Sequence, residues 1–276
     1  MLDFAKAHAY GNDFLYVSSA DVSGVALDAL ARQMCDRHSG VGADGLIVYT
    51  RETARADSAG QDVSMRLFNA DGSHAEVSGN GVRALGALLL DGSQDAAGEI
   101  VVHTAGGTKH LVRTSRNGRQ QTFRTAMGQP TGIAQRTVDV GGEAIALAVL
   151  NMGNPQAVLL GPLPEPSRFQ ALGSALERHE AFPDGTNVEF AQVEAPDRVR
   201  MLIWERGVGP TTSSGTGSCA ALVAAAAFGG ALRTADVVAP GGSQRVEWLP
   251  DGVYLTGWAE VICRGEWCRP LPVAAR

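Results

Sequence analysis

Apolar and polar residues alternate with a period of two over several short segments, a pattern typical of half-buried β-strands. In the first half of the chain the alternation predicts strands at residues 3–7, 14–18, 46–49, 64–69, 100–104, 109–113 and 121–127. In the second half it predicts strands at residues 144–150, 157–160, 187–193, 198–204, 245–248 and 253–259. The segment 109–113 should return as a hairpin around Gly106 and Gly107, while a polar loop is expected to extend to about Asp62.

Apolar residues recur at helical spacing in four other segments, at residues 27–36, 79–90, 168–178 and 215–228. The second helix of each half is apolar on nearly all sides, so it should be enclosed by a sheet of its own. Each half then combines mostly antiparallel strands with two helices. We predict an α+β fold and not a doubly wound parallel sheet.

The two halves repeat the same motifs in the same order. Residues 65–78 and 201–214 both run from a strand, through a turn that contains glycine, into Ser-Gly-x-Gly, at an offset of 136 (201 − 65). Two shorter motifs recur at offsets of 141 (178 − 37) and 142 (153 − 11): Asp36-Arg37-His38 as Glu177-Arg178-His179, and Gly11-Asn12 as Gly153-Asn154. Matches of this kind indicate an internal duplication.

A length of 276 residues fits two domains of ordinary size, given the repeat. We expect an N-terminal half at residues 1–122, completed by the C-terminal segment 263–276, and a C-terminal half at residues 123–262. The hydrophobic content of 45% and the 12 prolines describe a folded globular chain.

Composition excludes several classes of partner. A net charge of −6 without a Lys/Arg cluster argues against nucleic acid. The N-terminus does not resemble a secretory signal, and the longest apolar run, residues 219–232, is too short to span a bilayer, so we expect no membrane contact and a cytoplasmic protein. The cysteines and histidines lack metal-ligand spacing, so no metal is expected and the thiols should be reduced: Cys35, Cys219, Cys263 and Cys268.

Gly40-x-Gly42-x-x-Gly45 matches the dinucleotide-binding fingerprint by its letters. That motif must follow a strand and open a helix, whereas here a predicted helix precedes it and a predicted strand follows. The glycines are better interpreted as a tight loop that faces a small ligand.

Both Ser-Gly-x-Gly motifs open a buried helix, at Ser78 and Ser214. The first amides of a helix point outward with the positive end of the helix dipole behind them, which favours an anion. Two such helix starts are expected to grip one carboxylate between the halves, through the amides of Gly79, Asn80, Gly215 and Thr216. The alternative is that both serines act only as N-caps.

Polar side chains gather on the neighbouring loops. They are Asn12, Asn69, Asn154, Asn187, Glu205 and Arg206. Singly, each asparagine is more often a turn residue than a ligand contact. Together the set suits the zwitterionic end of an amino acid, with Arg206 for the carboxylate and Glu205 for the ammonium group.

The chain as a whole resembles the diaminopimelate epimerase family, in order and over nearly its full length. The motifs that carry this resemblance are Gly11-Asn12-Asp13-Phe14, Asp36-Arg37-His38, Gly42-Ala43-Asp44-Gly45, Phe68-Asn69-Ala70-Asp71-Gly72-Ser73, Gly79-Asn80-Gly81-Val82-Arg83, Met152-Gly153-Asn154-Pro155, Glu205-Arg206-Gly207-Val208-Gly209 and Gly215-Thr216-Gly217.

The resemblance implies two pseudo-symmetric domains, each a mostly antiparallel sheet or barrel around a central helix. It implies cofactor-independent epimerisation of LL- to meso-diaminopimelate, a step of lysine biosynthesis, with no pyridoxal phosphate. One base on each face of the α-carbon moves the proton, and these positions are Ser78 and Ser214 here. The substrate-binding positions would be Asn12, Gly45, Asn69, Gly79, Asn80, Asn154, Gln156, Asn187, Glu205, Arg206, Gly215 and Thr216. The oligomeric state stays open, with a homodimer as one option.

The sequence departs from the family at the bases, because both positions normally hold cysteine. A thiol titrates near pH ~8.5, and a hydroxyl lies roughly 4 to 5 units higher, so forming its anion costs about 6 kcal/mol more. A helix N-terminus returns only ~0.3 to 2 kcal/mol. Gln156 also stands where the family has histidine, and Pro210 where it has glutamate.

Three interpretations therefore stay open. The chain is an epimerase of diaminopimelate or a close relative, a divergent amino acid racemase or dehydratase on the same scaffold, or an amino acid-binding homologue with impaired catalysis. Exchange of the α-proton with solvent, and the identity of the product, distinguish them.

Overall fold

The computed structural model describes residues 1–52, 61–93 and 98–274. The chain folds into two compact units. Unit 1 comprises Met1–Thr125 and Trp258–Arg276, and unit 2 comprises Ala126–Gly257. The C-terminal segment therefore belongs to the same unit as the N-terminal half.

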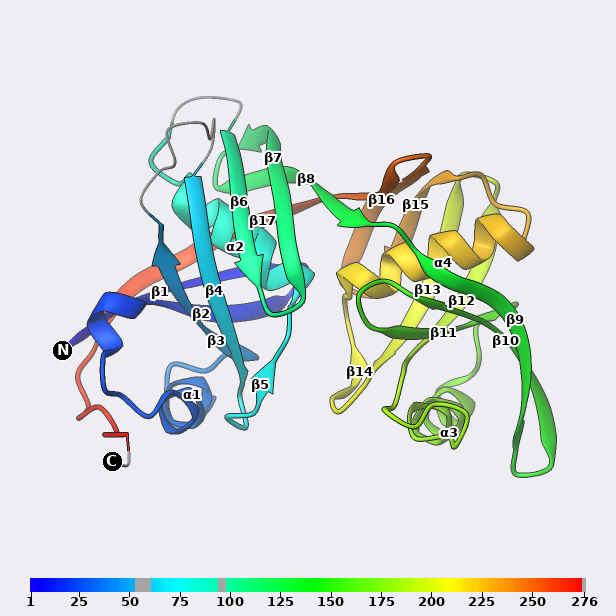
Figure 1. Cartoon of the computed structure of the whole chain (residues 1–276), viewed down its shortest axis with the longest axis horizontal. Coiled ribbons are helices and arrows are strands. Elements are labelled where there is room, and N and C mark those ends of the chain that lie inside the picture. Colours follow the sequence, from blue (N-terminus) through cyan, green and yellow to red (C-terminus); the bar gives the residue numbers. More distant parts are fainter. Residues whose placement is uncertain (53–60, 94–97, 275–276) are drawn as a thin grey trace. The chain divides into compact units, whose positions relative to one another are not determined.

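Unit 1 surrounds helix α2 with strands, and a second helix, α1, lies at its periphery (Figure 1). Strand β17 (Gly252–Trp267) continues into this unit and pairs with β1. The other elements are β1 (Leu2–Ala9), β2 (Asn12–Ser18), the 3-10 helix η1 (Ser19–Val22), α1 (Leu27–Cys35), β3 (Gly45–Arg51), β4 (Gln61–Asn69), β5 (His74–Ala75), α2 (Gly79–Leu89), β6 (Gly98–Thr104), β7 (Gly107–Asn117) and β8 (Gln120–Gly128).

Unit 2 has the same plan, with helix α4 inside the strands and α3 outside (Figure 1). Strand β16 pairs with the N-terminal part of β17. The elements are β9 (Thr131–Val140), β10 (Glu143–Asn151), β11 (Pro155–Leu160), α3 (Pro166–Glu177), β12 (Asn187–Ala195), β13 (Arg198–Glu205), β14 (Gly209–Thr211), α4 (Gly215–Phe228), β15 (Thr234–Ala239) and β16 (Gly242–Leu249).

Strand pairing repeats between the units, register included. Strands β2 and β3 are parallel with Phe14 opposite Gly45, and β11 and β12 are parallel with Gln156 opposite Asn187. Both members of the pair are displaced by 142 positions (156 − 14 and 187 − 45). Likewise β4 pairs with β6, and β13 with β15, in parallel, whereas most other pairs are antiparallel. The internal duplication seen in the sequence is thus present in the fold.

The sequences of the two central helices are largely apolar, which favours their burial. Ten of the 14 residues of α4 and ten of the 11 residues of α2 are buried. Small side chains in the run Cys219–Ala225 let the surrounding strands approach α4 closely. The predicted α+β class, with a sheet around each central helix, is confirmed.

Most predicted elements are present, but the sequence pattern missed four strands. Strands β5 and β14 are only two and three residues long. Strand β9 is largely exposed on both faces, so it lacks the alternation that marks a half-buried strand. Strand β15, of six residues, was not assigned from the sequence. Part of the predicted polar loop before Asp62, residues 53–60, lies outside the described residues.

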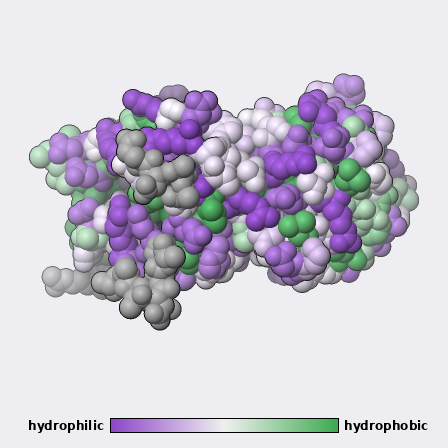
Figure 2. All heavy atoms as spheres, turned by 90° about the horizontal axis from the view of Figure 1, so that it is seen from above, coloured by the Kyte–Doolittle hydropathy of each residue, from purple (hydrophilic) through white to green (hydrophobic). Residues whose placement is uncertain are grey.

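Hydrophilic and hydrophobic residues are interspersed over the face seen in Figure 2. Exposed large hydrophobic side chains include Val112 and Ile262 in unit 1, and Val208 and Leu232 in unit 2. None of the helices in the described part of the chain is both long and apolar enough to cross a membrane.

Candidate active site

Each unit places a serine immediately before its central helix. Ser78 and Ser214 have the extended backbone of an N-cap residue, with φ and ψ of −124° and 121° for the first and −136° and 128° for the second. In both cases the serine Oγ accepts a hydrogen bond at 3.1 Å from the third helical N–H, that of Gly81 or Gly217. Both serines are therefore N-caps, and their hydroxyls have equivalent local geometry.

N-capping leaves hydrogen-bonding groups available at both helix starts. It occupies one lone pair of Oγ, so the hydroxyl proton and a second lone pair remain for other contacts. The N–H groups of the first two residues point out of the helix end, and these residues are Gly79 and Asn80 in α2 and Gly215 and Thr216 in α4. Each helix start thus combines a hydroxyl with amides that favour a carboxylate.

In unit 1, two predicted asparagines form one network beside the start of α2. Asn80 is 2% exposed, and its Nδ2 donates to Asn12 Oδ1 at 3.3 Å. Asn12 Nδ2 in turn donates to Asp44 Oδ2 at 2.7 Å. Both polar atoms of the Asn12 amide therefore have partners, which fixes the orientation of this side chain.

Ion pairs hold the loop before β3 against β2. Arg37 Nη2 lies 2.7 Å from a carboxylate oxygen of both Asp13 and Asp44, and Lys6 Nζ lies 2.8 Å from Asp13 Oδ2. Burial alone would raise the pKa of Asp13, but the hydrogen bonds and charges of Arg37 and Lys6 outweigh it and lower the pKa. Asp13 is thus ionised at neutral pH and anchors this loop.

Gly45 and Asn69 are opposite each other across β3 and β4. A Cβ at Gly45 would lie 2.7 Å from the backbone oxygen of Phe68, which is closer than real Cβ atoms approach. Asn69 Nδ2 donates to Ser73 Oγ at 2.9 Å. Packing against Phe68 therefore explains why residue 45 is a glycine, independently of any ligand.

In unit 2, three predicted residues join the start of α4 to two strands. Asn154 Nδ2 donates to Thr216 Oγ1 at 3.4 Å, and Gln156 Nε2 donates to Asn154 Oδ1 at 2.6 Å. Gln156 is 1% exposed and lies opposite Asn187. Gln156 is consequently an internal link between strand and helix, not a side chain that faces solvent.

Asn187 also organises the turn that carries Glu205 and Arg206. Its Oδ1 accepts from the Arg206 backbone N–H at 3.0 Å, and its Nδ2 donates to the Pro155 carbonyl at 3.2 Å. The Arg206 side chain is exposed, and its Nη1 donates to the Asp184 carbonyl at 3.0 Å. The backbone of Arg206 is anchored while its guanidinium reaches the surface.

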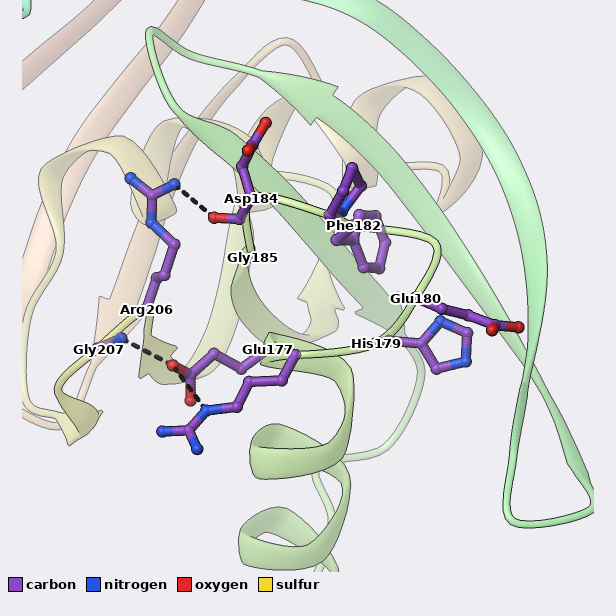
Figure 3. A pocket seen from close by; sticks show the side chains of 10 residues that line it. Glu177, His179, Glu180, Phe182, Asp184, Gly185, Arg206 and Gly207 are labelled. Atoms are coloured by element: carbon purple, nitrogen blue, oxygen red, sulfur yellow. Dashed lines mark hydrogen bonds and ion pairs between the residues drawn. The ribbon is translucent and has the colours of Figure 1, made fainter.

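A cavity of about 420 Å³ lies beside Arg206 (Figure 3). Near its floor the Glu177 carboxylate accepts from Trp204 Nε1 and the Gly207 N–H, both at 2.8 Å. Burial would raise the pKa of Glu177, but these hydrogen bonds outweigh it and lower the pKa. The lining residues are 177–180, 182–185, 206 and 207, and Ser214 is not among them, so this cavity does not include the start of α4.

Sequence reasoning missed Glu189, a fully buried carboxyl on β12. The Gln156 amide faces it, with a side-chain atom 2.9 Å from Oε1 and 3.2 Å from Oε2. Burial raises the pKa of Glu189 well above its ordinary value, and the charge of Glu205 adds to this effect. The internal repeat could have pointed to Glu189, because this acid occupies the position that the apolar Ile47 occupies 142 residues earlier (189 − 47).

Within residues 1–52, 61–93 and 98–274, no group of three or more His, Cys, Asp and Glu side chains could hold a metal ion. All four cysteines are free, and Cys35 and Cys219 are buried. Burial, with the charges of Asp13 and Asp44, raises the pKa of Cys35 to about 12. This thiol is therefore no base at neutral pH.

Comparison with known proteins decides the family. Residues 4–133 and 148–262 match the family model described as diaminopimelate epimerase. The chain belongs to the diaminopimelate epimerase family. The diaminopimelate epimerase of Pelotomaculum thermopropionicum is 37% identical over 283 residues, which cover 96% of this chain and 99% of that one. That of Desulforudis audaxviator is 37% identical over 290 residues, covering 97% and 100%.

The fold extends beyond this family. The structure of a probable proline racemase from Agrobacterium radiobacter K84 superposes with a TM-score of 0.72 at 17% identity, covering 97% of this chain and 93% of that one. At such low identity the likeness concerns the fold alone. Through its membership of the diaminopimelate epimerase family, the chain is an isomerase of the epimerase and racemase class.

Proposed function

We propose that the chain epimerises diaminopimelate, or a closely related amino acid, at the α-carbon without a cofactor. Ser78 serves one face of the carbon and Ser214 the other. The observation that carries this proposal is the equivalence of the two helix starts, where each Oγ lies 3.1 Å from the third helical amide nitrogen. A two-base reaction needs such a hydroxyl and amide group twice.

In this proposal the reacting carboxylate of the substrate binds the amides of Gly79, Asn80, Gly215 and Thr216. One serine, having given up its own hydroxyl proton, takes the α-proton on its oxygen, and the electron pair of the broken C–H bond delocalises into the substrate carboxylate. Helix amides aimed at this carboxylate stabilise the charge as it develops. The other serine then gives its hydroxyl proton to the carbon from the opposite face, so the configuration inverts.

The far end of the substrate would set its orientation. Arg206 binds the second carboxylate, for which an exposed guanidinium with an anchored backbone is suited, and Glu205 binds the ammonium group. The other residues proposed to contact the substrate are Asn12, Gly45, Asn69, Asn154, Gln156 and Asn187. Gln156 would act mainly by holding Asn154 in place, since it is 1% exposed.

Deuterium incorporation tests this function. In deuterium oxide, LL- and meso-diaminopimelate should each acquire deuterium at the α-carbon and interconvert, as followed by NMR and chiral chromatography. Ser78→Ala and Ser214→Ala should each abolish interconversion. Ser174→Ala, on the exposed side of α3, is the matched control and should change nothing. Tight binding of diaminopimelate without any deuterium uptake would instead identify a binding protein.

A second candidate is racemisation or dehydration of another amino acid on the same scaffold. Ser78, Ser214 and Gln156 favour it, because they differ from the residues that the family has at or beside the bases. The residues expected to bind an amino acid are nevertheless present. A panel of amino and imino acids separates the two, because a dehydratase gives a new product where an epimerase gives a stereoisomer.

We also propose that the reaction takes place in the cytoplasm. The four free cysteines, Cys35, Cys219, Cys263 and Cys268, fit a reducing compartment. The substrate is a small molecule, and a homodimer is the assembly to test first by light scattering.

A further inference from the structure

The Glu189 carboxyl and the Ser214 hydroxyl border the same small space above β12. A Cβ built on Gly217 would lie 2.8 Å from Glu189 Oε1 and 3.1 Å from Ser214 Oγ. Two oxygens this close to one point lie within the span of a single bridging water molecule. The glycine at position 217 keeps this space open, because any side chain there would push the two groups apart.

Unit 1 has no carboxyl at the corresponding place. A Cβ built on Gly81 would meet Ile47 Cδ1 at 2.8 Å and Phe14 Cε2 at 3.5 Å. Ile47 corresponds to Glu189 in the repeat, and Phe14 corresponds to Gln156. The two serines are alike as N-caps, but Ser78 lies over an apolar surface and Ser214 lies beside an acid.

A buried carboxyl is costly unless it is hydrogen-bonded, so its presence under α4 calls for a role. Glu189 is 0% exposed, and besides Ser214 its neighbours with polar side chains include Gln156 on β11 and Glu205 on β13. The first turn of α4 supplies no acidic residue. Within the described part of the chain, the charged side chain that acts on Glu189 is the like-charged Glu205, so an ion pair does not explain this side chain.

The Gln156 amide can follow the protonation of Glu189. With Nε2 towards Asn154 Oδ1, at 2.6 Å, the amide oxygen faces Glu189 and can accept a hydrogen bond from a neutral carboxyl. With the amide turned over, Nε2 donates to both carboxylate oxygens, at 2.9 Å and 3.2 Å. In the turned orientation Gln156 Oε1 lies 2.6 Å from Asn154 Oδ1, so the Asn154 amide has to turn as well and donate its Nδ2 to Gln156. The two amides together can therefore serve both the neutral and the ionised form.

We propose that Glu189 is the proton partner of Ser214 in the reaction assigned above, on which this inference rests. When Ser214 Oγ takes the α-proton, its own hydroxyl proton passes to the Glu189 carboxylate, and the electron pair stays on the substrate. In the reverse direction, neutral Glu189 returns a proton to Oγ as the hydroxyl proton passes to carbon. No alkoxide has to form at Ser214. Glu189 is a positioning residue, because it acts through the serine.

The test compares Glu189→Gln in two backgrounds, wild type and Ser214→Cys. A thiol titrates near pH ~8.5, several units below a hydroxyl, so it depends on Glu189 less than a hydroxyl does. In the wild-type background we expect Glu189→Gln to lower kcat for α-proton exchange by at least about 100-fold, with KM little changed. In the Ser214→Cys background the same substitution should change kcat by less than about 3-fold, since a lost packing contact alone is the remaining effect. Glu99→Gln, at an exposed position, is the control.

An equal loss in both backgrounds would mean that Glu189 only supports the fold, and no loss in the wild-type background would mean that it is not used; either result overturns the inference. Activity of the chain with both Glu189→Gln and Ser214→Cys shows that the variant folds. If the wild-type chain exchanges no α-proton with any amino acid, the proposed function itself fails, which is a different outcome from these two.

Discussion

Glu189 occupies in β12 the position that Ile47 occupies in β3, each beneath the third residue of a serine-capped helix. Ile47 lies opposite Tyr16, and Glu189 lies opposite Val158. These strands pack against α2 and α4, so the side chain at this position faces the helix. The duplicated halves have thus diverged from an apolar contact to a buried acid at one point. This difference should affect stability as well as the reaction proposed above.

The first prediction concerns the loss of stability as pH rises above the unfolded pKa of Glu189, ~4.3. The pKa of Glu189 is raised in the folded state, so its contribution to stability is complete below the unfolded pKa of ~4.3 and is lost as pH rises through the folded pKa. The free energy of unfolding should fall with rising pH by up to ~1.4 kcal/mol per pH unit in that window. Glu189→Gln should remove this slope in urea titrations. An unchanged slope, with Glu99→Gln as reference, would contradict the prediction.

The second prediction concerns stability at low pH. The pKa of Asp13 is lowered in the folded state, so its contribution is complete above the unfolded pKa of ~3.9 and is lost as pH falls through the folded pKa. Asp13→Asn should lower the free energy of unfolding at pH 7 by about 1.5–3 kcal/mol, because Lys6 and Arg37 lose a charged partner. The difference should shrink in acid.

Asp3→Asn is the control for Asp13→Asn, since Asp3 is exposed on β1. The two variants are compared by urea unfolding at pH 7 and at the lowest pH where the chain stays folded. An Asp13→Asn deficit that is equal at both pH values would show that packing, and not the ionised carboxylate, is what the substitution removes.

The third prediction concerns the backbone contact at Gly45. A Cβ there meets the Phe68 carbonyl at 2.7 Å, and backbone cannot move aside as a side chain can. Gly45→Ala should therefore lower the free energy of unfolding by about 1–3 kcal/mol. Gly92→Ala is the matched control, because nothing lies within 4 Å of a Cβ at that position. Equal stability of the two variants in thermal unfolding would show that β3 and β4 separate easily.

Much of the fold follows from short-range pattern. Helix α4 begins and ends where the apolar run and Ser214 predict, because an all-apolar helix and an N-cap serine are both local signals. Strand β9 was missed because its residues are mostly exposed, and exposure removes the alternation on which such predictions depend. Pairing with β10 then decides its conformation, which is a non-local contact.

The sequence indicates the polar residues of the candidate site more readily than the buried residue Glu189 beneath it. Asn12 and Arg206 stand out in the sequence as polar residues in turns, whereas Glu189 lies between Val188 and Phe190 in a strand that looks like core. The repeat aligns Glu189 with Ile47, but the structure is needed to show that its side chain lies under α4. Chemistry that depends on a buried partner needs the fold before it can be seen.

The fourth prediction concerns the acidity of the bases. If the pocket fits diaminopimelate and lacks only acidity, Ser78→Cys and Ser214→Cys together should raise the rate of epimerisation. The hydroxyl anion costs about 6 kcal/mol more than the thiolate, but proton transfer to Glu189 avoids part of that cost at Ser214. The gain should therefore come mainly from Ser78→Cys, because Ser78 faces Ile47 and Phe14 and has no carboxyl there. Chiral chromatography of the single and double variants measures this. A larger gain from Ser214→Cys alone would contradict the asymmetry, while no gain from either would indicate a substrate other than diaminopimelate.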